Sequence, residues 1–140
     1  MKRILIANCI LLASTAAQAS PQVDCLAKMA YMEARGINKQ AVKDVTDVMF
    51  NRIKHHKFPD SVCKNINKKG QYTWAAKGSK VKDIQTYKAI YKQVDSEYAK
   101  FKLGTWKDGT NGAMYFNNRP GKPYPKAKFL FKRNGHYFYK

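Results

Sequence analysis

The chain has 140 residues, 27 of them Lys or Arg and nine Asp or Glu, which gives a net charge of +18. A field of this sign attracts anionic polymers such as nucleic acid, acidic cell-wall polymers or lipopolysaccharide. The length fits one domain with a modest core. Two of the chain's three cysteines lie beyond the N-terminal apolar run, and two cysteines with three scattered histidines do not form a zinc site, so we expect no metal.

The N-terminus is typical of a secretory signal. Two basic residues precede a mostly apolar run from Ile4 to Ala17, and Ala17-Gln18-Ala19 supplies small residues before a cleavage point. A permanent membrane anchor needs about 20 apolar residues, more than this run provides, although an uncleaved N-terminal anchor is the alternative. We expect a signal peptide over residues 1–19 and one folded domain over residues 20–140, exported to the periplasm or beyond. Export argues against nucleic acid as the usual partner.

Loss of the signal would leave two cysteines, Cys25 and Cys63. An even count in an exported domain favours a disulfide, with two buried free thiols as the alternative. A disulfide closing a loop of this length stabilises by about 3–4 kcal/mol in the chain-entropy model.

Two helices are predicted after the signal. Apolar residues from Val23 to Ala34 recur at helical spacing, and Gly36 is a natural stop. Asn38 is placed to cap a second helix, whose inner face carries apolar residues from Ala41 to Ile53.

The stretch from Cys63 to Lys82 is rich in Lys, Gly and Asn and is predicted to be a long loop around Gln71-Tyr72-Thr73-Trp74. Long loops in compact domains are often functional. Asp83 is predicted to cap a third helix that stops at Gly104. Its expected inner face consists of Ile84, Tyr87, Tyr91, Val94, Tyr98 and Phe101.

The last part of the chain has the pattern of a small sheet. The segment from Ala113 to Asn117 is a short strand candidate, and the apolar segments 129–131 and 137–139 flank Asn134-Gly135, a strong hairpin signal. Helices followed by a small antiparallel sheet with a C-terminal hairpin define an α+β domain.

The sequence contains two glutamates, Glu33 and Glu97. Glu97 is expected on the polar side of the third helix, paired with Lys100. Glu33 lies at the edge of the apolar stripe of the first helix, and partial burial raises the pKa of a carboxyl, as a general acid working near neutrality requires. On spacing alone, a glutamate one turn before the end of a helix more often has a structural role.

The segment Tyr31-Met32-Glu33-Ala34-Arg35-Gly36 resembles the Tyr-His-Glu-Ala-Arg-Gly-Glu signature of the spore-cortex-lytic (SleB-type) family of cell-wall hydrolases. Met32 stands where the family usually has histidine, and Ile37 where it has a second acid. Met32 is expected to point away from the apolar stripe, so a loss of activity does not follow. Further blocks resemble the family in the same order, namely Cys25-Leu26-Ala27, Asn51-Arg52-Ile53, Phe58-Pro59-Asp60-Ser61-Val62-Cys63, Gln71-Tyr72-Thr73-Trp74, Gly112-Ala113-Met114-Tyr115-Phe116-Asn117 and His136-Tyr137-Phe138-Tyr139.

The resemblance implies a lysozyme-like domain that cleaves peptidoglycan between N-acetylmuramic acid and N-acetylglucosamine by lytic transglycosylation, without a cofactor. Glu33 would act twice, first as acid and then as base. A conventional glycosidase needs two carboxylates, so a muramidase is the nearest alternative. Asp44 and Asp47, expected on the polar side of the second helix, are poor candidates for a second carboxylate, whereas Asp60 and Asp108 lie in expected loops and stay open.

Amides and hydroxyls suit the acetamido groups of the glycan, and aromatic faces suit sugar rings. The alternatives are core packing for Trp74 and Tyr115 and a structural hydrogen bond for His136. The expected substrate contacts are Gln71, Thr73, Trp74, Tyr115, Asn117 and His136.

Two other classes of protein are compatible with the sequence. One is a non-catalytic basic protein that binds envelope polymers, and the other is an exported nucleic-acid binder. As an enzyme, the chain fits a phage endolysin that uses the host export route as well as a periplasmic wall-remodelling enzyme. We expect a monomer.

Overall fold

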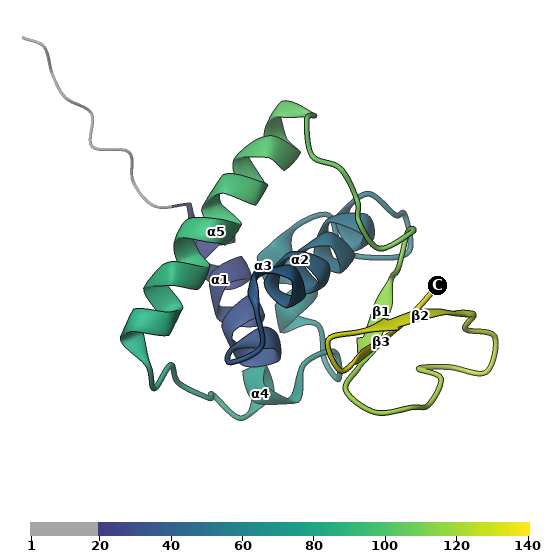
Figure 1. Ribbon diagram of the computed structural model, residues 1–140. Coiled ribbons are helices and arrows are strands. Elements are labelled where there is room, and N and C mark those ends of the chain that lie inside the picture. The colour runs from purple at the N-terminus through teal and green to yellow at the C-terminus, as the bar shows by residue number, and fades with distance from the viewer. Residues whose placement is uncertain (1–19) are drawn as a thin grey trace, which may run out of the picture.

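The computed structural model describes residues 20–140, so the expected signal peptide lies outside the described residues. Five helices precede a three-stranded antiparallel sheet, and the expected α+β order is confirmed (Figure 1). The helices are α1 (Pro21–Ala34), α2 (Lys39–Ile53), α3 (Val62–Asn67), α4 (Thr73–Ala76) and α5 (Ile84–Leu103). The strands are β1 (Tyr115–Asn117), β2 (Phe129–Arg133) and β3 (His136–Tyr139).

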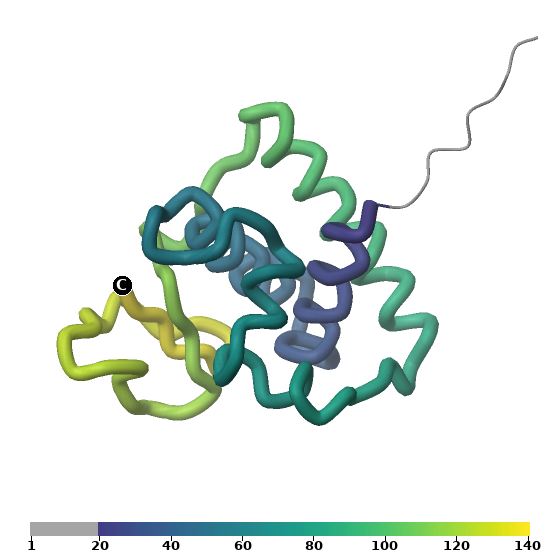
Figure 2. Tube along the Cα trace, turned by 180° about the vertical axis from the view of Figure 1, so that it is seen from behind, coloured from purple at the N-terminus to yellow at the C-terminus, as the bar shows by residue number. Residues whose placement is uncertain are grey.

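Helix α2 lies at the centre of the molecule, with α1 and α5 on one side and the sheet on the other, as both views show (Figures 1 and 2). The predicted inner face of α1 is confirmed, since its apolar residues from Val23 to Ala34 are buried. Asn38 caps α2 as predicted, because its Oδ1 accepts the backbone N–H of Ala41 at 2.9 Å. Met32, expected to point away from the stripe, packs against the core and is half-buried.

Helix α5 begins and ends where the sequence predicts. Asp83 accepts the backbone N–H of Thr86 at 3.1 Å, and Gly104 closes the helix in the left-handed conformation with φ +77°. The predicted inner face is wrong at one residue, Ile84. Ile84 is 54% exposed because it begins the helix beyond the edge of the core, whereas Ile90 is buried.

The predicted long loop between Cys63 and Lys82 is wrong in part, because it contains most of α3 and all of α4. Ser61 caps α3 by accepting the backbone N–H of Lys64 at 3.3 Å. These helices have six and four residues. They are too short to show an apolar period, which needs two or three turns to be recognised.

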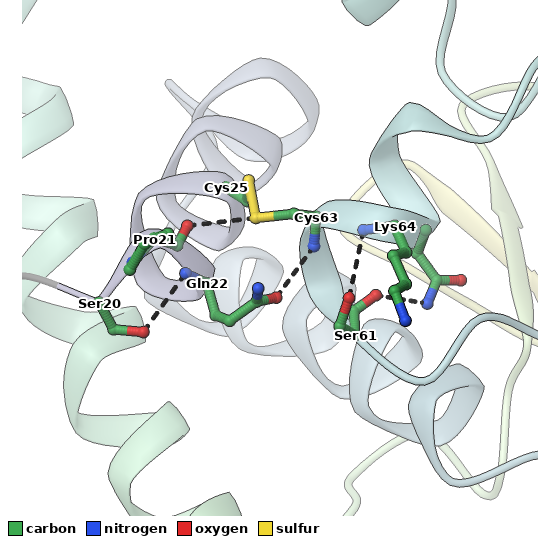
Figure 3. Close-up of a disulfide and its surroundings, with 8 residues drawn as sticks. Ser20, Pro21, Gln22, Cys25, Ser61, Cys63 and Lys64 are labelled. Carbon is green, nitrogen blue, oxygen red and sulfur yellow. Dashed lines mark hydrogen bonds between the residues drawn. A yellow bond between two sulfur atoms is a disulfide. The ribbon is translucent and has the colours of Figure 1, made fainter.

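The predicted disulfide is confirmed (Figure 3). Cys25 on α1 is bonded to Cys63 on α3, with 5.4 Å between their Cα atoms. Next to it, the side-chain oxygen of Gln22 accepts the backbone N–H of Cys63 at 3.1 Å. The covalent link therefore holds the short helix α3, and the segment that follows it, against α1.

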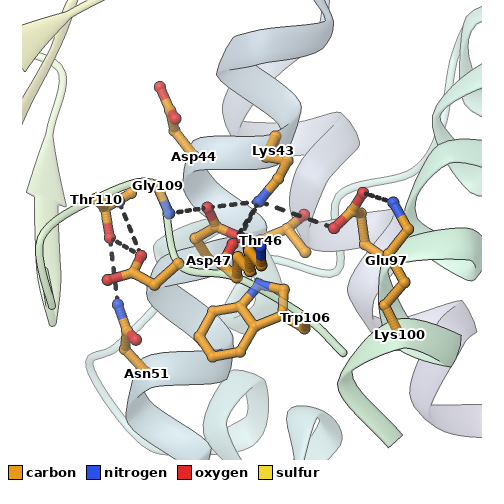
Figure 4. Close-up of polar contacts among 12 residues, drawn as sticks. Lys43, Asp44, Thr46, Asp47, Asn51, Glu97, Lys100, Trp106, Gly109 and Thr110 are labelled. Carbon is orange, nitrogen blue, oxygen red and sulfur yellow. Dashed lines mark hydrogen bonds and ion pairs between the residues drawn. The ribbon is translucent and has the colours of Figure 1, made fainter. Parts of the chain in front are cut away.

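The expectation that Asp44 and Asp47 lie on a polar side of α2 is wrong, because both side chains are fully buried. Asp47 accepts from Lys43 Nζ at 2.7 Å, Trp106 Nε1 at 2.8 Å and the Gly109 backbone N–H at 2.9 Å (Figure 4). Burial nevertheless raises the pKa of Asp47. The segment after α5 covers this side of α2 and supplies two of these three donors, Trp106 and Gly109, to the buried carboxylate.

Glu97 also differs from the expectation of an exposed residue. The predicted pair with Lys100 is confirmed, with 3.0 Å between Nζ and Oε1, but Glu97 is only 8% exposed. Its other oxygen lies 3.8 Å from Lys43 Nζ (Figure 4). Glu97 thus connects α5 to the buried polar cluster of α2.

The sheet has the order β1-β3-β2, and β3 is paired on both sides. Asn134 and Gly135 form the predicted hairpin turn with φ values of +52° and +78°, a left-handed pair that suits Asn-Gly. Phe138 of β3 is fully buried in a small cluster with Val48 of α2, which fixes the sheet against the helical layer. Among the helices within residues 20–140, none is long and apolar enough to cross a membrane.

Candidate active site

The carboxyl of Glu33 lies at the C-terminal end of α1, where it faces the segment that leads into α4. Its Oε1 accepts the indole N–H of Trp74 at 2.7 Å. The backbone carbonyl of the same residue lies 3.1 Å from His136 Nε2, a contact that requires the hydrogen on Nε2. Glu33 is therefore held by its side chain from α4 and by its backbone from β3.

Three influences act on the pKa of Glu33. Burial is the largest and raises the pKa above its ordinary value, because a low-dielectric environment disfavours the charged form. The hydrogen bond from Trp74 and the positive charge of Arg52 act in the opposite direction. The net result is a raised pKa, as expected for a general acid.

The Glu33 side chain opens on a groove of about 510 Å³ between the helical layer and β1. The groove is lined by Glu33, Arg52, Gly70, Gln71, Tyr72, Thr73, Tyr115, Phe116, Asn117, Asn118 and Pro123. Glu33 is the one carboxylate in this lining. Four of the six expected substrate contacts are present in it: Gln71, Thr73, Tyr115 and Asn117.

The other two expected contacts lie beside the groove rather than in its lining. Trp74 packs against Tyr72, with 5.4 Å between ring centroids, and directs its N–H to Glu33. His136, expected to bind substrate, is instead 3% exposed behind Glu33. Burial lowers the pKa of His136, which favours the neutral ring, and its Nδ1 has no partner within residues 20–140.

Arg52 and Tyr72 were not predicted as site residues. Arg52 is 3% exposed, and its Nη1 donates to the Tyr72 hydroxyl at 3.0 Å. Helical spacing from Ala41 and Val45 through Val48 places Arg52 on the inner face of α2. An arginine at an inner-face position was the sequence signal that could have found this residue, because a buried charge is rarely without function or partner.

The aspartates that the sequence left open do not line the groove. Asp60 is exposed and pairs with Lys64 at 2.9 Å. Asp108 accepts the backbone N–H groups of Thr110 at 2.8 Å and Gly112 at 2.6 Å, which fixes a turn. Within residues 20–140, no group of three or more His, Cys, Asp or Glu side chains is placed to hold a metal ion.

The groove between the helical layer and the small sheet thus contains a single acid, and comparisons with known proteins show which class of protein has this fold. The sequence profile of the cell wall hydrolase family matches residues 37–139, most of the described chain, so this chain belongs to the cell wall hydrolase family. It is a peptidoglycan-cleaving enzyme. The matched region begins after Glu33, so the profile does not itself cover that residue.

Two solved structures share the fold. The catalytic domain of the Bacillus cereus SleB protein is 23% identical, with a TM-score of 0.61, over 85% of this chain and 89% of that one. The catalytic domain of the germination-specific lytic transglycosylase SleB from Bacillus anthracis is 22% identical, with a TM-score of 0.64, over 89% of this chain and 98% of that one. The resemblance to the SleB-type family is confirmed. A comparison with curated protein sequences gives no significant match.

Proposed function

We propose that this enzyme cleaves the bond between N-acetylmuramic acid and N-acetylglucosamine by lytic transglycosylation, with Glu33 as both acid and base. The observation that carries the proposal is that Glu33 is the one carboxylate lining the groove. Hydrolysis by the usual route needs a second carboxylate, as nucleophile or to activate water. A transglycosylase can use one carboxyl group twice.

The first step requires neutral Glu33. Its proton goes to the glycosidic oxygen, the bond from that oxygen to the anomeric carbon breaks, and positive charge develops on the muramic acid ring. The raised pKa of Glu33 keeps the proton available near neutral pH. The hydrogen bond from Trp74 restricts rotation of the carboxyl, and such positioning contributes to the rate.

The second step uses the carboxylate left by the first. Glu33 takes the proton of the muramic acid C6 hydroxyl while that oxygen bonds to the anomeric carbon, which forms a 1,6-anhydro ring and restores neutral Glu33. The Trp74 N–H and the Arg52 charge both favour the carboxylate and so stabilise this intermediate state of the enzyme. No metal or organic cofactor takes part in these two steps.

The groove supplies groups suited to a glycan. Gln71, Thr73 and Asn117 offer amides and a hydroxyl for the acetamido and hydroxyl groups of the sugars, and Tyr115 offers an aromatic face. We assign His136 a positioning role, because its Nε2 is already engaged by the Glu33 carbonyl.

The test is a zymogram on purified peptidoglycan with wild type and Glu33→Gln, followed by mass spectrometry of the products. We expect clearing by wild type alone, with a loss of at least about a hundredfold in the variant, and anhydro-muropeptides as products. Products with reducing ends would identify a muramidase instead. Equal clearing by both proteins would remove Glu33 from this role.

We also propose that the enzyme is exported through residues 1–19 and acts outside the cytoplasm as a monomer. Loss of Lys2 and Arg3 with these residues lowers the net charge from +18 to +16, which still attracts the enzyme to anionic envelope polymers. N-terminal sequencing of the secreted protein tests cleavage after Ala19. Induction in a bacterial host with and without residues 1–19 tests a role as an endolysin, because lysis should then depend on the leader.

A further inference from the structure

Arg52 is a buried cation at the wall of the groove. The residue is 3% exposed and is nevertheless among the residues that line the groove. Removing a charged group from water is costly unless an opposite charge or good hydrogen bonds compensate it. The partners of Arg52 therefore indicate what the groove is built to receive.

All direct partners of Arg52 within residues 20–140 are neutral. Its Nε donates to the backbone carbonyl of Met114 at 2.6 Å, and Nη1 donates to the Tyr72 hydroxyl at 3.0 Å. The guanidinium carbon lies 5.3 Å from the ring centroid of Phe58 and 5.4 Å from that of Tyr115. None of the ion pairs in this part of the chain involves Arg52. The aromatic rings and neutral acceptors fix the guanidinium but leave its charge without a carboxylate partner.

The side of the guanidinium that carries both terminal nitrogens faces Gln71. With the amide of Gln71 oriented to satisfy both groups, its oxygen accepts from Nη1 at 3.2 Å and from Nη2 at 3.1 Å. An arginine binds a carboxylate through two parallel hydrogen bonds from either of two edges, and in Arg52 the other edge is engaged because Nε donates to Met114. A carboxylate would therefore take the place of the Gln71 amide at the two-nitrogen edge formed by Nη1 and Nη2. Gln71 is a half-buried residue of the segment between α3 and α4, and it lines the groove. A neutral side chain thus occupies the position that suits an anion.

Glu33 does not provide the missing negative charge when the reaction begins. The proposed first step needs Glu33 protonated, so in that state the groove contains a cation and no anion of its own. A substrate that brings a carboxylate would complete the charge balance. A neutral sugar would leave it incomplete.

We propose that Arg52 is a carboxylate-recognition residue, and that the enzyme prefers glycan with a free carboxylate close to the cleaved bond. This inference rests on the proposed function for the position of that bond. Peptidoglycan offers two sources of the carboxylate. One is the lactyl group of muramic acid after removal of the peptide stem, and the other is an acidic group of the stem itself.

The experiment compares substrates that differ only in the carboxylate. Stem-free glycan strands carry free lactyl carboxylates, and the same strands after methyl esterification carry none. We expect wild type to show a kcat/KM about tenfold or more higher on the free acid, the size of a charge-assisted hydrogen bond. Arg52→Gln should reduce this ratio to near one. Arg52→Lys should give an intermediate ratio, because it keeps the charge but not the two-nitrogen edge.

A matched control is Lys102→Gln, which removes one positive charge from an exposed position near the end of α5. It should keep the wild-type ratio. Because the ratio compares two substrates of one protein, a variant that is partly unfolded still gives a valid value. The proposal is overturned if wild type does not distinguish the acid from the ester or if Arg52→Gln keeps the preference, unless the stem is the source.

A second comparison, used as the second arm of the experiment, tests whether the stem is the source of the carboxylate. Glycan with intact stems is compared with the same material after esterification of the stem carboxylates, again with wild type and Arg52→Gln. An Arg52-dependent preference in this arm alone assigns the carboxylate to the stem. The absence of such a preference in both arms overturns the proposal.

Binding separates this proposal from the proposed function. Calorimetric titration of Glu33→Gln with the stem-free acid and its ester measures recognition without cleavage, and Glu33→Gln/Arg52→Gln is the comparison. If Glu33→Gln still cleaves, the proposed mechanism fails, but the acid should still bind more tightly than the ester in an Arg52-dependent way. If cleavage is lost as expected and both ligands bind equally, only the carboxylate proposal fails.

Discussion

The indole N–H of Trp74 donates to Glu33 Oε1 at 2.7 Å and so joins the start of α4 to the end of α1. The hydrogen bond favours the carboxylate, whereas burial of the same group favours the neutral acid. Burial has the larger effect. Glu33 thus begins as an acid while its ionised form keeps a fixed donor, which suits a group that must give up a proton and take one back.

Trp74→Phe removes the donor and keeps most of the ring. We expect the pKa of Glu33 to rise further, because one of the two influences that lower it is lost. In the proposed mechanism activity requires the protonated acid and falls as the pH rises through this pKa, so the alkaline limb of the kcat profile should move to higher pH. We also expect kcat to fall about tenfold, because the carboxyl is less well oriented.

Trp106→Phe is the matched control for this variant. Trp106 also donates to a buried carboxylate, Asp47 Oδ1 at 2.8 Å, but it does not line the groove. The control should lower the melting temperature and leave the alkaline limb in place. An alkaline limb that stays unmoved in Trp74→Phe would contradict the role assigned to the indole.

Glu33→Gln should be more stable than wild type at neutral pH. The pKa of Glu33 is raised in the folded state, so below the unfolded value of about 4.3 both states are protonated and ionisation carries no penalty. As the pH rises through the folded pKa, the wild type must bury a charge and loses stability, while the variant does not. We expect the melting temperature of the variant to be higher by about 2–5 °C at pH 7 and equal to that of wild type near pH 4.

Scanning calorimetry over this pH range checks the expectation. Glu97→Gln, a change of the one other glutamate, provides the contrast. It removes the charge that faces Lys100 and Lys43 and should lower the melting temperature at pH 7. A lower melting temperature for Glu33→Gln at pH 7 would show that the carboxylate raises the stability of the fold instead of lowering it.

Asp44→Ala should destabilise the fold strongly. Arg133 of β2 donates to both oxygens of Asp44, at 2.8 Å from Nε and 2.6 Å from Nη2, and the Asp44 side chain is fully buried. The Arg133 side chain is 37% exposed, so the variant loses charge-assisted hydrogen bonds but leaves no buried charge, and we expect a cost of about 1.5–3 kcal/mol. The free energy of unfolding in urea measures the loss. Asp60→Ala breaks an exposed pair with Lys64 and should leave the urea midpoint unchanged. Similar losses in both variants would contradict the structural importance of the pair between Asp44 and Arg133.

Loss of the disulfide should lower stability by about 3–4 kcal/mol in the chain-entropy model, since Cys25 and Cys63 are 38 residues apart. Cys63→Ser tests this by urea unfolding with and without a reducing agent. The reductant should lower the midpoint of wild type to that of the variant and leave the variant unchanged. An unchanged wild-type midpoint in reductant would mean that the link contributes nothing to the fold.

Local sequence signals predicted much of the scaffold. These signals depend on neighbours within about one or two helical turns, so they can be read directly from the sequence. They are the apolar periods of α1 and α2, the caps at Asn38 and Asp83, and the Asn134-Gly135 turn. The same reasoning failed for α3 and α4, which are too short to show a period, and for Ile84, which lies at the very start of α5.

The candidate site divides in the same way. The sequence by itself determined that Glu33 was the leading acid, because one competing glutamate exists and Glu33 borders an apolar stripe. Only the tertiary structure decided what surrounds it. Trp74 is 41 residues away and His136 is 103 residues away along the chain. Asp44 is buried and paired with Arg133, 89 residues away, for the same reason. The burial and charge of a side chain depend on distant segments that pack over it, and no local pattern records those partners.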